Sequence, residues 1–312
     1  MNTFGTNFRF TSFGESHGLA VGGIIDGCPS RLALDTDAIR ADLARRRGEG
    51  DETTTRREAD EVEFLSGVMD GITLGTPIAF AIRNADTRPD DYEELRHLCR
   101  PGHADFTYQA RYGIRDHRGG GRASGRETAA RVVAGAIAKQ LLAQRGIGCR
   151  AAVAELAPQT PDDTRGGSVR CVVQGLPAGV GDPVFGRLNA MLAAAMMSIP
   201  SSTAFEMGVG TQAADMTGSA FADQWLAGGR TVTNHCGGVQ GGISNGMPVE
   251  FKVTFHAVPT LPHEVDCLAD DGTLRRVNLG GRHDTCHILR LPVVVEAMAA
   301  LTIVNLIDLK EQ

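Results

Sequence analysis

The sequence predicts an α+β fold in which residues 1–312 form one domain. Segments with the alternating pattern of strands and segments with the 3.6-residue period of helices are mixed along the whole chain. No stretch rich in proline or serine divides it, and no short repeat occurs. A chain of this length with 42% hydrophobic residues can bury one large core or two modest ones. We therefore expect a single α+β domain built from two similar layers.

The first third of the chain predicts strands around one short helix. A strand entering a tight loop opens the sequence, and a second strand is expected over residues 21–25. Asp35 or Thr36 is a suitable N-cap for the helix that follows, which we expect to end at residues 45–47, three successive arginines. Arginines at that end suit the helix dipole, and an anion-binding role for them is an equally open alternative.

A polar segment and the clearest helix come next. Residues 48–60 are rich in threonine and charge, which predicts a mobile loop, and residues 62–65 and 78–82 resemble strands. Apolar residues recur at helical spacing over residues 126–145. The glycine-rich run before this helix leads directly into its N-terminus, where free N–H groups and the dipole favour an anion.

The second half of the chain predicts two more helices and a strand. A long helix is expected over residues 184–198, and apolar residues alternate over 249–255 as in a half-buried strand. The last helix is expected from Pro292 to about Leu309. Because its apolar stretch contains Glu296 and other polar residues, we expect a core helix and not a membrane span.

Composition narrows the class of protein. The net charge of −6 argues against nucleic acid as the main partner, since neutralising phosphates needs a basic surface. The 7 cysteines are scattered and include no C-x-x-C pair, which favours neither a disulfide framework nor a zinc site. The histidines are too far apart for close-spaced metal ligands. With no signal-like N-terminus and no membrane-length apolar run, we expect a cytoplasmic protein.

Three glycine-rich segments carry histidine, arginine and acid in settings for which a packed core has no use. They are residues 14–18, 116–126 and 280–284. Glycine lets the backbone approach a ligand closely, and the arginine fork binds phosphate and carboxylate groups. Alone, Gly-Glu-Ser-His-Gly is more often a turn with a satisfied histidine. Together with the similar segment at residues 100–105, the segments indicate an enzyme that acts on a small anionic molecule.

At this point the chain resembles the chorismate synthase family, in order from Asn2 to about Leu309. Several of the shared motifs are long and specific. They are Gly-Glu-Ser-His-Gly at 14–18 with Asp-Gly-Cys-Pro at 26–29, Arg-Pro-Gly-His-Ala-Asp at 100–105, Tyr-Gly-Ile-Arg-Asp at 112–116, Arg-Gly-Gly-Gly-Arg at 118–122 with Arg-Glu-Thr at 126–128, Gly-Gly-Val-Gln-Gly-Gly-Ile-Ser-Asn-Gly at 237–246, Gly-Arg-His-Asp at 281–284, and Glu-Ala-Met at 296–298.

The resemblance implies a fold, an activity and partners. The fold would be a β-α-β sandwich with helices enclosed between antiparallel sheets, usually assembled as a homotetramer. The activity would be that of a lyase at the last common step of the shikimate pathway, which leads to the aromatic amino acids. Such enzymes convert 5-enolpyruvylshikimate 3-phosphate to chorismate and phosphate by 1,4-anti elimination. They need reduced FMN (FMNH2), thought to lend electron density transiently as phosphate leaves. An external flavin reductase would supply it, and NADP is associated with the family.

The resemblance also implies roles for individual residues. His17 would be the general acid at the departing phosphate, His103 would lie against the reduced flavin, and Asp284 would be the base that removes the ring proton with the flavin's help. The substrate-binding residues would be Ser16, Arg46, Arg122 and Arg126. The cofactor-binding residues would be Arg122, Ser124, Pro200, Gly241, His256, Thr260 and Arg282.

Departures from the family pattern put part of this in question. Where the family has a neutral or basic segment after the three arginines, this chain has acid, including Glu52. Such acid should repel an anionic substrate unless Arg56 or Arg57 compensates.

On the flavin side, Thr203 and His256 stand where the family usually has lysine. A histidine can be neutral at pH 7 where lysine is charged, which would weaken flavin binding. The segment around residues 146–168 is also shorter than usual. The alternatives to an active lyase are a diverged homologue that binds a flavin or related anion without this activity, and a non-catalytic flavin or nucleotide binder.

Overall fold

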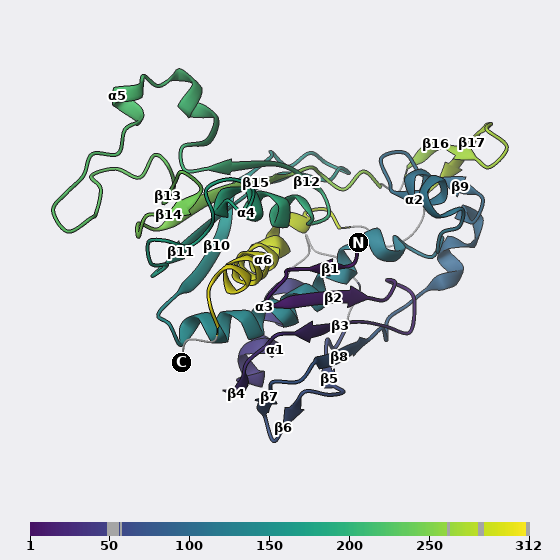
Figure 1. The fold of residues 1–312 in the computed structure, drawn as a ribbon. Helices are drawn as coiled ribbons and strands as arrows, with labels where there is room; N and C mark the ends of the chain where they lie inside the picture. The colour runs from purple at the N-terminus through teal and green to yellow at the C-terminus, as the bar shows by residue number, and fades with distance from the viewer. Residues whose placement is uncertain (49–55, 57, 261–262, 280–283, 310–312) are drawn as a thin grey trace.

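The computed structural model describes residues 1–48, 56, 58–260, 263–279 and 284–309. Two antiparallel sheets lie on either side of a layer of helices (Figure 1). This confirms the expected α+β sandwich with helices enclosed between antiparallel sheets. The main hydrophobic core contains residues from both sheets and from the helices between them.

The first sheet is formed by the N-terminal segments, in the order β1-β2-β3-β8-β5. Its strands turn apolar side chains such as Phe10, Val21, Ile25 and Phe80 toward the helices, where they are buried. The strands expected at 21–25, 62–65 and 78–82 are confirmed with small changes of boundary. The strand bounds are β1 Thr3–Phe4, β2 Arg9–Phe13, β3 Ala20–Asp26, β5 Val62–Phe64 and β8 Ile78–Arg83.

The second sheet has the order β10-β11-β15-β12. Every second residue of β15 is buried, as the alternation of Val249, Phe251, Val253 and Phe255 predicts. The expected strand over 249–255 is therefore confirmed. The strand bounds are β10 Gly148–Leu156, β11 Gly167–Gln174, β12 Ser202–Met207 and β15 Val249–Phe255.

Four helices fill the space between the sheets (Figure 1). Helix α3 packs on strands of the first sheet, and α6 packs on β10 and β11 of the second. Asp35 caps the first helix by accepting from the backbone N–H of Ala38 at 2.9 Å, as one of the two suggested caps. The bounds are α1 Thr36–Arg47, α3 Thr128–Ala143, α4 Leu188–Met197 and α6 Leu291–Leu306.

Helices α3 and α6 touch so closely that Gly135 has no room for a side chain. A Cβ atom at Gly135 would lie 2.3 Å from the Cβ of Ala297 and 2.4 Å from its Cα. Among the described residues, one helical segment, His287–Leu306, is long and apolar enough to cross a membrane by length and composition. It is 78% buried inside the protein, between α3 and the second sheet, as expected for a core helix.

Three helix boundaries differ from the expectation. The helix expected to begin at 184 begins at Leu188, because Asp182 and Gly186 close a turn through an N–H···O bond of 3.0 Å. The last helix ends at Leu306, where Ile307 is extended, and not at Leu309. The glycine-rich run does not lead directly into α3, since a 3₁₀ turn over Gly125–Glu127 comes between them.

Short elements surround this body. The arm that carries α5 extends from the second sheet, and the β16–β17 hairpin lies at the opposite side (Figure 1). The remaining bounds are β4 Ser30–Ala33, β6 Val68–Met69, β7 Ile72–Leu74, β9 Leu98–Cys99, β13 Val239–Gln240, β14 Ile243–Ser244, β16 Glu264–Ala269, β17 Leu274–Asn278, α2 Asp105–Tyr112, α5 Gly218–Phe221, and 3₁₀ turns at Pro89–Leu95, Gly121–Ala123, Gly210–Asp215 and His287–Arg290.

A half-buried histidine joins the 3₁₀ turn before α6 to the turn before β12 in the second sheet. The Nε2 atom of His287 lies 2.7 Å from the hydroxyl of Ser201, in the turn before β12. Burial lowers the pKa of His287 to about 4, and nearby His256 adds to this shift. The folded chain therefore holds this imidazole neutral.

Gly135→Ala should destabilise the protein strongly, because the new methyl group would force α3 and α6 apart. We expect the free energy of unfolding to fall by about 1–3 kcal/mol, measured by urea denaturation. Gly148→Ala is the matched control, since no heavy atom lies within 4 Å of that Cβ position. Equal losses in the two variants would contradict the close helix contact.

The free energy of unfolding should decrease as pH falls from about 6.5 toward 4, because the unfolded chain binds a proton at His287 while the folded chain does not. Above pH 6.5 His287 does not lower the free energy of unfolding. By pH 4, protonation of His287 in the unfolded chain has lowered the free energy of unfolding by about 3 kcal/mol. His287→Asn should make this part of the pH profile shallower. An unchanged slope in chemical denaturation between pH 6.5 and 4.5 would refute the assignment.

Candidate active site

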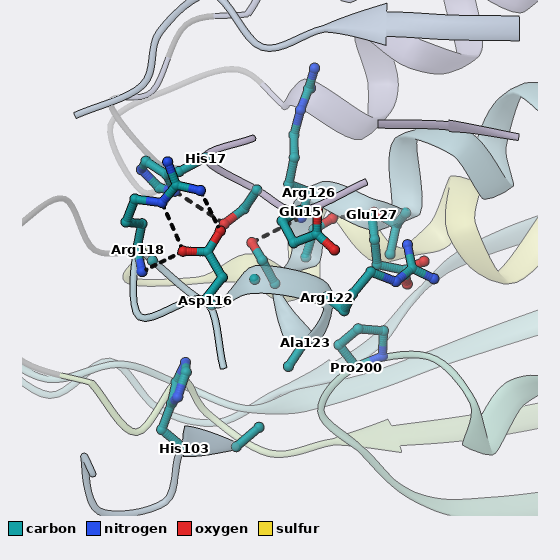
Figure 2. Close-up of a pocket in the computed structure, with 18 of the residues that line it drawn as sticks. Glu15, His17, His103, Asp116, Arg118, Arg122, Ala123, Arg126, Glu127 and Pro200 are labelled. Carbon is teal, nitrogen blue, oxygen red and sulfur yellow. Dashed lines mark hydrogen bonds and ion pairs between the residues drawn. The ribbon is translucent and has the colours of Figure 1, made fainter. Parts of the chain in front are cut away.

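A cavity of about 1780 Å³ opens between the two sheets. The first turns of both central helices border it, through Thr128 and Arg131 of α3 and Leu291 and Val294 of α6. Helix N-termini carry free N–H groups and partial positive charge, which favour anions. Figure 2 shows His17, His103, Arg122, Arg126 and Pro200 around this cavity, although they come from separate parts of the chain.

The loop between β2 and β3 carries Ser16 and His17. The Ser16 hydroxyl lies 3.1 Å from His17 Nδ1, and the Ser16 N–H donates to the carbonyl of Gly121 at 3.2 Å. Gly119 has a φ of +65°, and a Cβ there would lie 2.5 Å from His17 Nδ1. The glycine-rich run therefore lies directly against His17, which is one reason for its glycines.

His103 is held by a buried carboxylate. Its Nδ1 lies 3.0 Å from Asp105 Oδ1. Arg100 donates to the same carboxylate from Nε at 2.7 Å, and Arg115 lies 3.3 Å from it. Hydrogen bonds from His103 and Arg100 outweigh burial and hold the pKa of Asp105 well below its usual range. Arg100 also donates to the carbonyl of Gly119 at 2.7 Å, which connects this cluster to the glycine-rich run.

The three successive arginines at the end of α1 have three different environments. Arg45 donates to Glu296 of α6 from Nη1 at 2.7 Å and from Nη2 at 2.8 Å, so it supports the helix packing. Arg46 points into the cavity wall. Arg47 donates to the carbonyl of Glu58 at 2.9 Å. Of the three, Arg46 is the one that is buried in the cavity wall.

Arg46 and Arg126 meet at Asp60, and all three side chains are buried. Arg46 donates from Nε to Thr128 Oγ1 at 2.9 Å and from Nη2 to the Gly125 carbonyl at 2.7 Å. Arg126 forms a short ion pair with Asp60 Oδ1. The Nη1 of Arg46 lies 3.7 Å from Asp60 Oδ2.

The positive charge around Arg46 exceeds the acid that faces it. Burial lowers the pKa of Arg46 to about 9, while Asp60 opposes the shift and Arg126, Arg290 and Arg56 strengthen it. A lowered pKa at a guanidinium that stays charged measures an unfavourable electrostatic environment. An anion bound in the cavity would relieve it.

Asp284 forms an ion pair with Arg290 at the beginning of α6. Its other carboxylate oxygen, Oδ1, is buried and makes no hydrogen bond to any described residue. Burial lowers the pKa of Arg290 to about 10, partly opposed by Asp60. Asp284 is therefore a cavity-lining carboxylate with one acceptor oxygen that no described residue occupies.

The described contacts of Arg56, one of the two residues suggested to compensate for Glu52, are with Glu58 and the backbone of Ser16. Its guanidinium binds Glu58 from Nη2 at 2.6 Å and the Ser16 carbonyl at 2.9 Å. Glu58 in turn accepts from the Ala85 N–H at 2.9 Å. Glu52 and Arg57, with most of the loop expected over 48–60, lie outside the described residues.

Most of the flavin-side residues border the same cavity, namely Arg122, Ser124, Pro200, His256 and Thr260. Arg122 donates to Ser12 Oγ at 2.8 Å, and Ser124 accepts from the Arg126 N–H at 3.2 Å. Within the described ranges, no group of three or more His, Cys, Asp or Glu side chains is arranged to hold a metal ion.

Gly241 does not border the cavity. Gly241 borders a separate hollow of about 400 Å³, beside Arg187 and His235 at the base of the arm. Arg282 lies outside the described residues.

Two departures from the family pattern lie away from the cavity. Thr203 is exposed on β12, and it does not border the cavity. The shortened segment around 146–168 forms β10 and its connection to β11, and none of its residues borders the cavity either. His256 does border it, and its Nδ1 lies 2.6 Å from the Ala257 carbonyl.

Sequence reasoning missed Asp60, Glu58 and Arg290. Asp60 and Glu58 belong to a stretch whose polarity predicted only a loop, and Arg290 stands before an apolar helix without a glycine-rich motif. One signal was available for Asp60, whose φ of +55° is tolerated best by Gly, Asn and Asp.

Comparisons with known proteins agree with this geometry. The family model for chorismate synthase matches residues 8–162 and 157–307. The chain is 43% identical to the chorismate synthase of Christiangramia forsetii, over 97% of this chain and 96% of the relative. It is 44% identical to that of Bacteroides thetaiotaomicron, over 97% of each chain.

A crystal structure of a chorismate synthase superposes with a TM-score of 0.75 at 27% identity, covering 97% of this chain and 92% of the other. The fold, the motifs around the cavity and these relatives lead to one conclusion. The chain belongs to the chorismate synthase family, the chorismate-forming lyases of the shikimate pathway.

Proposed function

We propose that the cavity binds 5-enolpyruvylshikimate 3-phosphate together with reduced FMN and converts the substrate to chorismate and phosphate by 1,4-anti elimination. The observation that carries this proposal is that two buried arginines, Arg46 and Arg126, share one carboxylate, Asp60, in the wall of the cavity that also holds His17. The substrate carries a phosphate and two carboxylates. Buried guanidinium groups are suited to such anions because they form paired, charge-assisted hydrogen bonds.

His17 would donate the proton that the departing phosphate needs. An alkyl phosphate leaves more easily when its bridging oxygen is protonated, and a positioned histidine is the usual donor. The contact of Ser16 Oγ with His17 Nδ1 and the close approach of Gly119 fix the ring. Ser16, Arg46, Arg122 and Arg126 would hold the substrate beside it.

Asp284 would accept the proton that leaves the ring carbon. Its Oδ1 is a buried acceptor without a described hydrogen-bond partner, which is suitable for a base. The ion pair with Arg290 orients the carboxylate. Arg290 thus supports the base and contributes to the positive field around the substrate.

The cavity fits a flavin beside the substrate. Gly119 and Gly121 have φ values of +65° and +51°, and the run Gly119–Gly121 presents backbone without side chains to the cavity. Arg122, Ser124, Pro200, His256 and Thr260 would hold the cofactor, with Gly241 and Arg282 as further proposed contacts, and His103 would lie against it. When bound, reduced FMN supplies electron density to the substrate as phosphate leaves.

We also propose that residues 1–312 act as one domain within a cytoplasmic homotetramer. Apolar side chains on the arm are exposed in the single chain, including Trp225, Leu226 and Val232, which is consistent with subunit contacts. A separate flavin reductase would supply the reduced FMN.

His17→Ala should abolish chorismate formation while the protein remains folded, because the leaving phosphate loses its proton donor. The assay is anaerobic, with chemically reduced FMN and 5-enolpyruvylshikimate 3-phosphate, and follows chorismate absorbance. We expect kcat to fall by about 100-fold or more. His97→Ala is the matched control, since His97 is exposed and lies outside the cavity.

If the parent protein forms no chorismate at saturating reduced FMN, the proposed elimination is wrong. Retained flavin binding without turnover would then indicate the diverged homologue. Activity of His17→Ala equal to that of His97→Ala would remove His17 from the mechanism and leave the rest intact.

Asp284→Asn should lower kcat by about 100-fold or more and change the substrate Kd only a few-fold, because the amide keeps the shape but cannot accept the proton. The split is measured by combining steady-state kinetics with calorimetric binding of substrate. A loss confined to Kd would show that Asp284 binds the substrate and is not the base.

A further inference from the structure

Two buried arginines in the cavity wall, Arg46 and Arg126, share one residue of the opposite charge, Asp60. Asp60 lies just before β5, and only 4% of its surface is exposed. Its backbone is left-handed, with a φ of +55°. Among residues with side chains, aspartate and asparagine tolerate that conformation best, and only aspartate adds a charge.

Asp60 faces cations from three separate elements. Arg126 comes from the 3₁₀ turn before α3 and forms an ion pair with Oδ1. Arg46 comes from the end of α1, with its Nη1 3.7 Å from Oδ2. Arg290 comes from the 3₁₀ turn before α6 and interacts electrostatically with the same carboxylate. One buried carboxylate is thus the common counter-ion of groups that would otherwise repel one another.

The pairing is incomplete on the Arg46 side. Asp60 Oδ2 is buried and makes no hydrogen bond to any described residue. At 3.7 Å, Arg46 Nη1 is close enough for attraction but too far for a hydrogen bond. Asp60 therefore orients the Arg46 guanidinium but does not accept a hydrogen bond from its Nη1. Burial and the neighbouring arginines still lower the pKa of Arg46, although Asp60 opposes the shift.

We propose that Asp60 is a positioning residue for the substrate's anionic groups, because it fixes the guanidinium groups of Arg46 and Arg126 in the cavity wall and leaves their net charge positive. Arg126 is also held by Asn84 Oδ1 at 2.9 Å and by the Arg83 carbonyl at 3.3 Å. This inference rests on the proposed function, since the anion concerned is that of the substrate. Asp60 acts through the arginines and does not touch the reacting atoms.

Two effects of removing the Asp60 charge oppose each other. The field in the cavity becomes more positive, which favours anions at long range, but the guanidinium groups lose the partner that sets their direction. Hydrogen bonds between a guanidinium and an oxyanion depend strongly on geometry. We therefore expect the loss of orientation to dominate and substrate binding to weaken.

The test is Asp60→Asn, which tolerates the left-handed backbone and nearly preserves the shape. Calorimetric titration with 5-enolpyruvylshikimate 3-phosphate should give a Kd raised about tenfold or more, as expected for one charged hydrogen bond. In the chorismate assay KM should rise similarly, with kcat changed only a few-fold. Glu63→Gln is the matched control, because this substitution also removes one negative charge. Glu63 pairs with Arg83 on the exposed side of β5.

A double variant tests whether Asp60 affects substrate binding through Arg126 or independently of it. If Asp60 acts through Arg126, the loss in Asp60→Asn combined with Arg126→Gln should be clearly smaller than the sum of the single losses. Additive losses, or a Kd for Asp60→Asn that is unchanged or tighter, would overturn the proposal.

Asp60→Gly is a second variant for the case in which Asp60→Asn does not fold, since glycine accepts the same backbone conformation. It should show the same weakened binding in a folded protein. If neither variant folds, Asp60 serves the fold and the proposal is wrong. Because the titration does not depend on turnover, failure of the proposed elimination would appear separately, as a parent protein that binds substrate but forms no chorismate.

Discussion

The close packing of α3 against α6 is the constraint on which the rest of the structure depends. The first sheet packs on α3 and the second on α6, so their contact at Gly135 and Ala297 joins the two halves of the sandwich. The first turns of both helices border the same cavity. The site therefore contains two helix N-termini, residues of the first sheet and residues that flank strands of the second sheet. A shift of one helix against the other would displace both sides of the site.

Charge in the cavity is arranged so that the protein alone does not neutralise it. Burying arginine without a partner is costly, and each buried guanidinium here has at least one acceptor. Yet Arg46 keeps a lowered pKa in spite of Asp60. The polar contacts give each buried guanidinium a partner, and a bound anion would further stabilise the charge of Arg46. The proposed substrate, with three anionic groups, would be such an anion, and its own charge would be shielded from water.

Sequence reasoning predicted the architecture well where periodicity and capping are local. The alternation of β15, the N-cap of α1 and the apolar period of α3 all correspond to the structure. The start of α4 was missed because a turn closed by Asp182 and Gly186 overrides the helical pattern there.

The candidate site was predictable only where motifs carry it. Motifs placed His17, His103, Arg126 and Asp284 in one cavity, which composition and spacing could not have done. The separate environments of Arg45 and Arg46 depend on which residue of a helix end faces α6, a tertiary fact. Asp60 escaped notice because its partners are far away in sequence.

A crystal structure of the protein with 5-enolpyruvylshikimate 3-phosphate bound would show whether the buried arginines bind the substrate. We expect an anionic group of the substrate within hydrogen-bond distance, about 3 Å, of the Arg46 and Arg126 guanidinium groups, with the phosphate next to His17. Substrate bound in the hollow beside Gly241, or bound in the cavity with both arginines contacting only protein, would contradict this expectation.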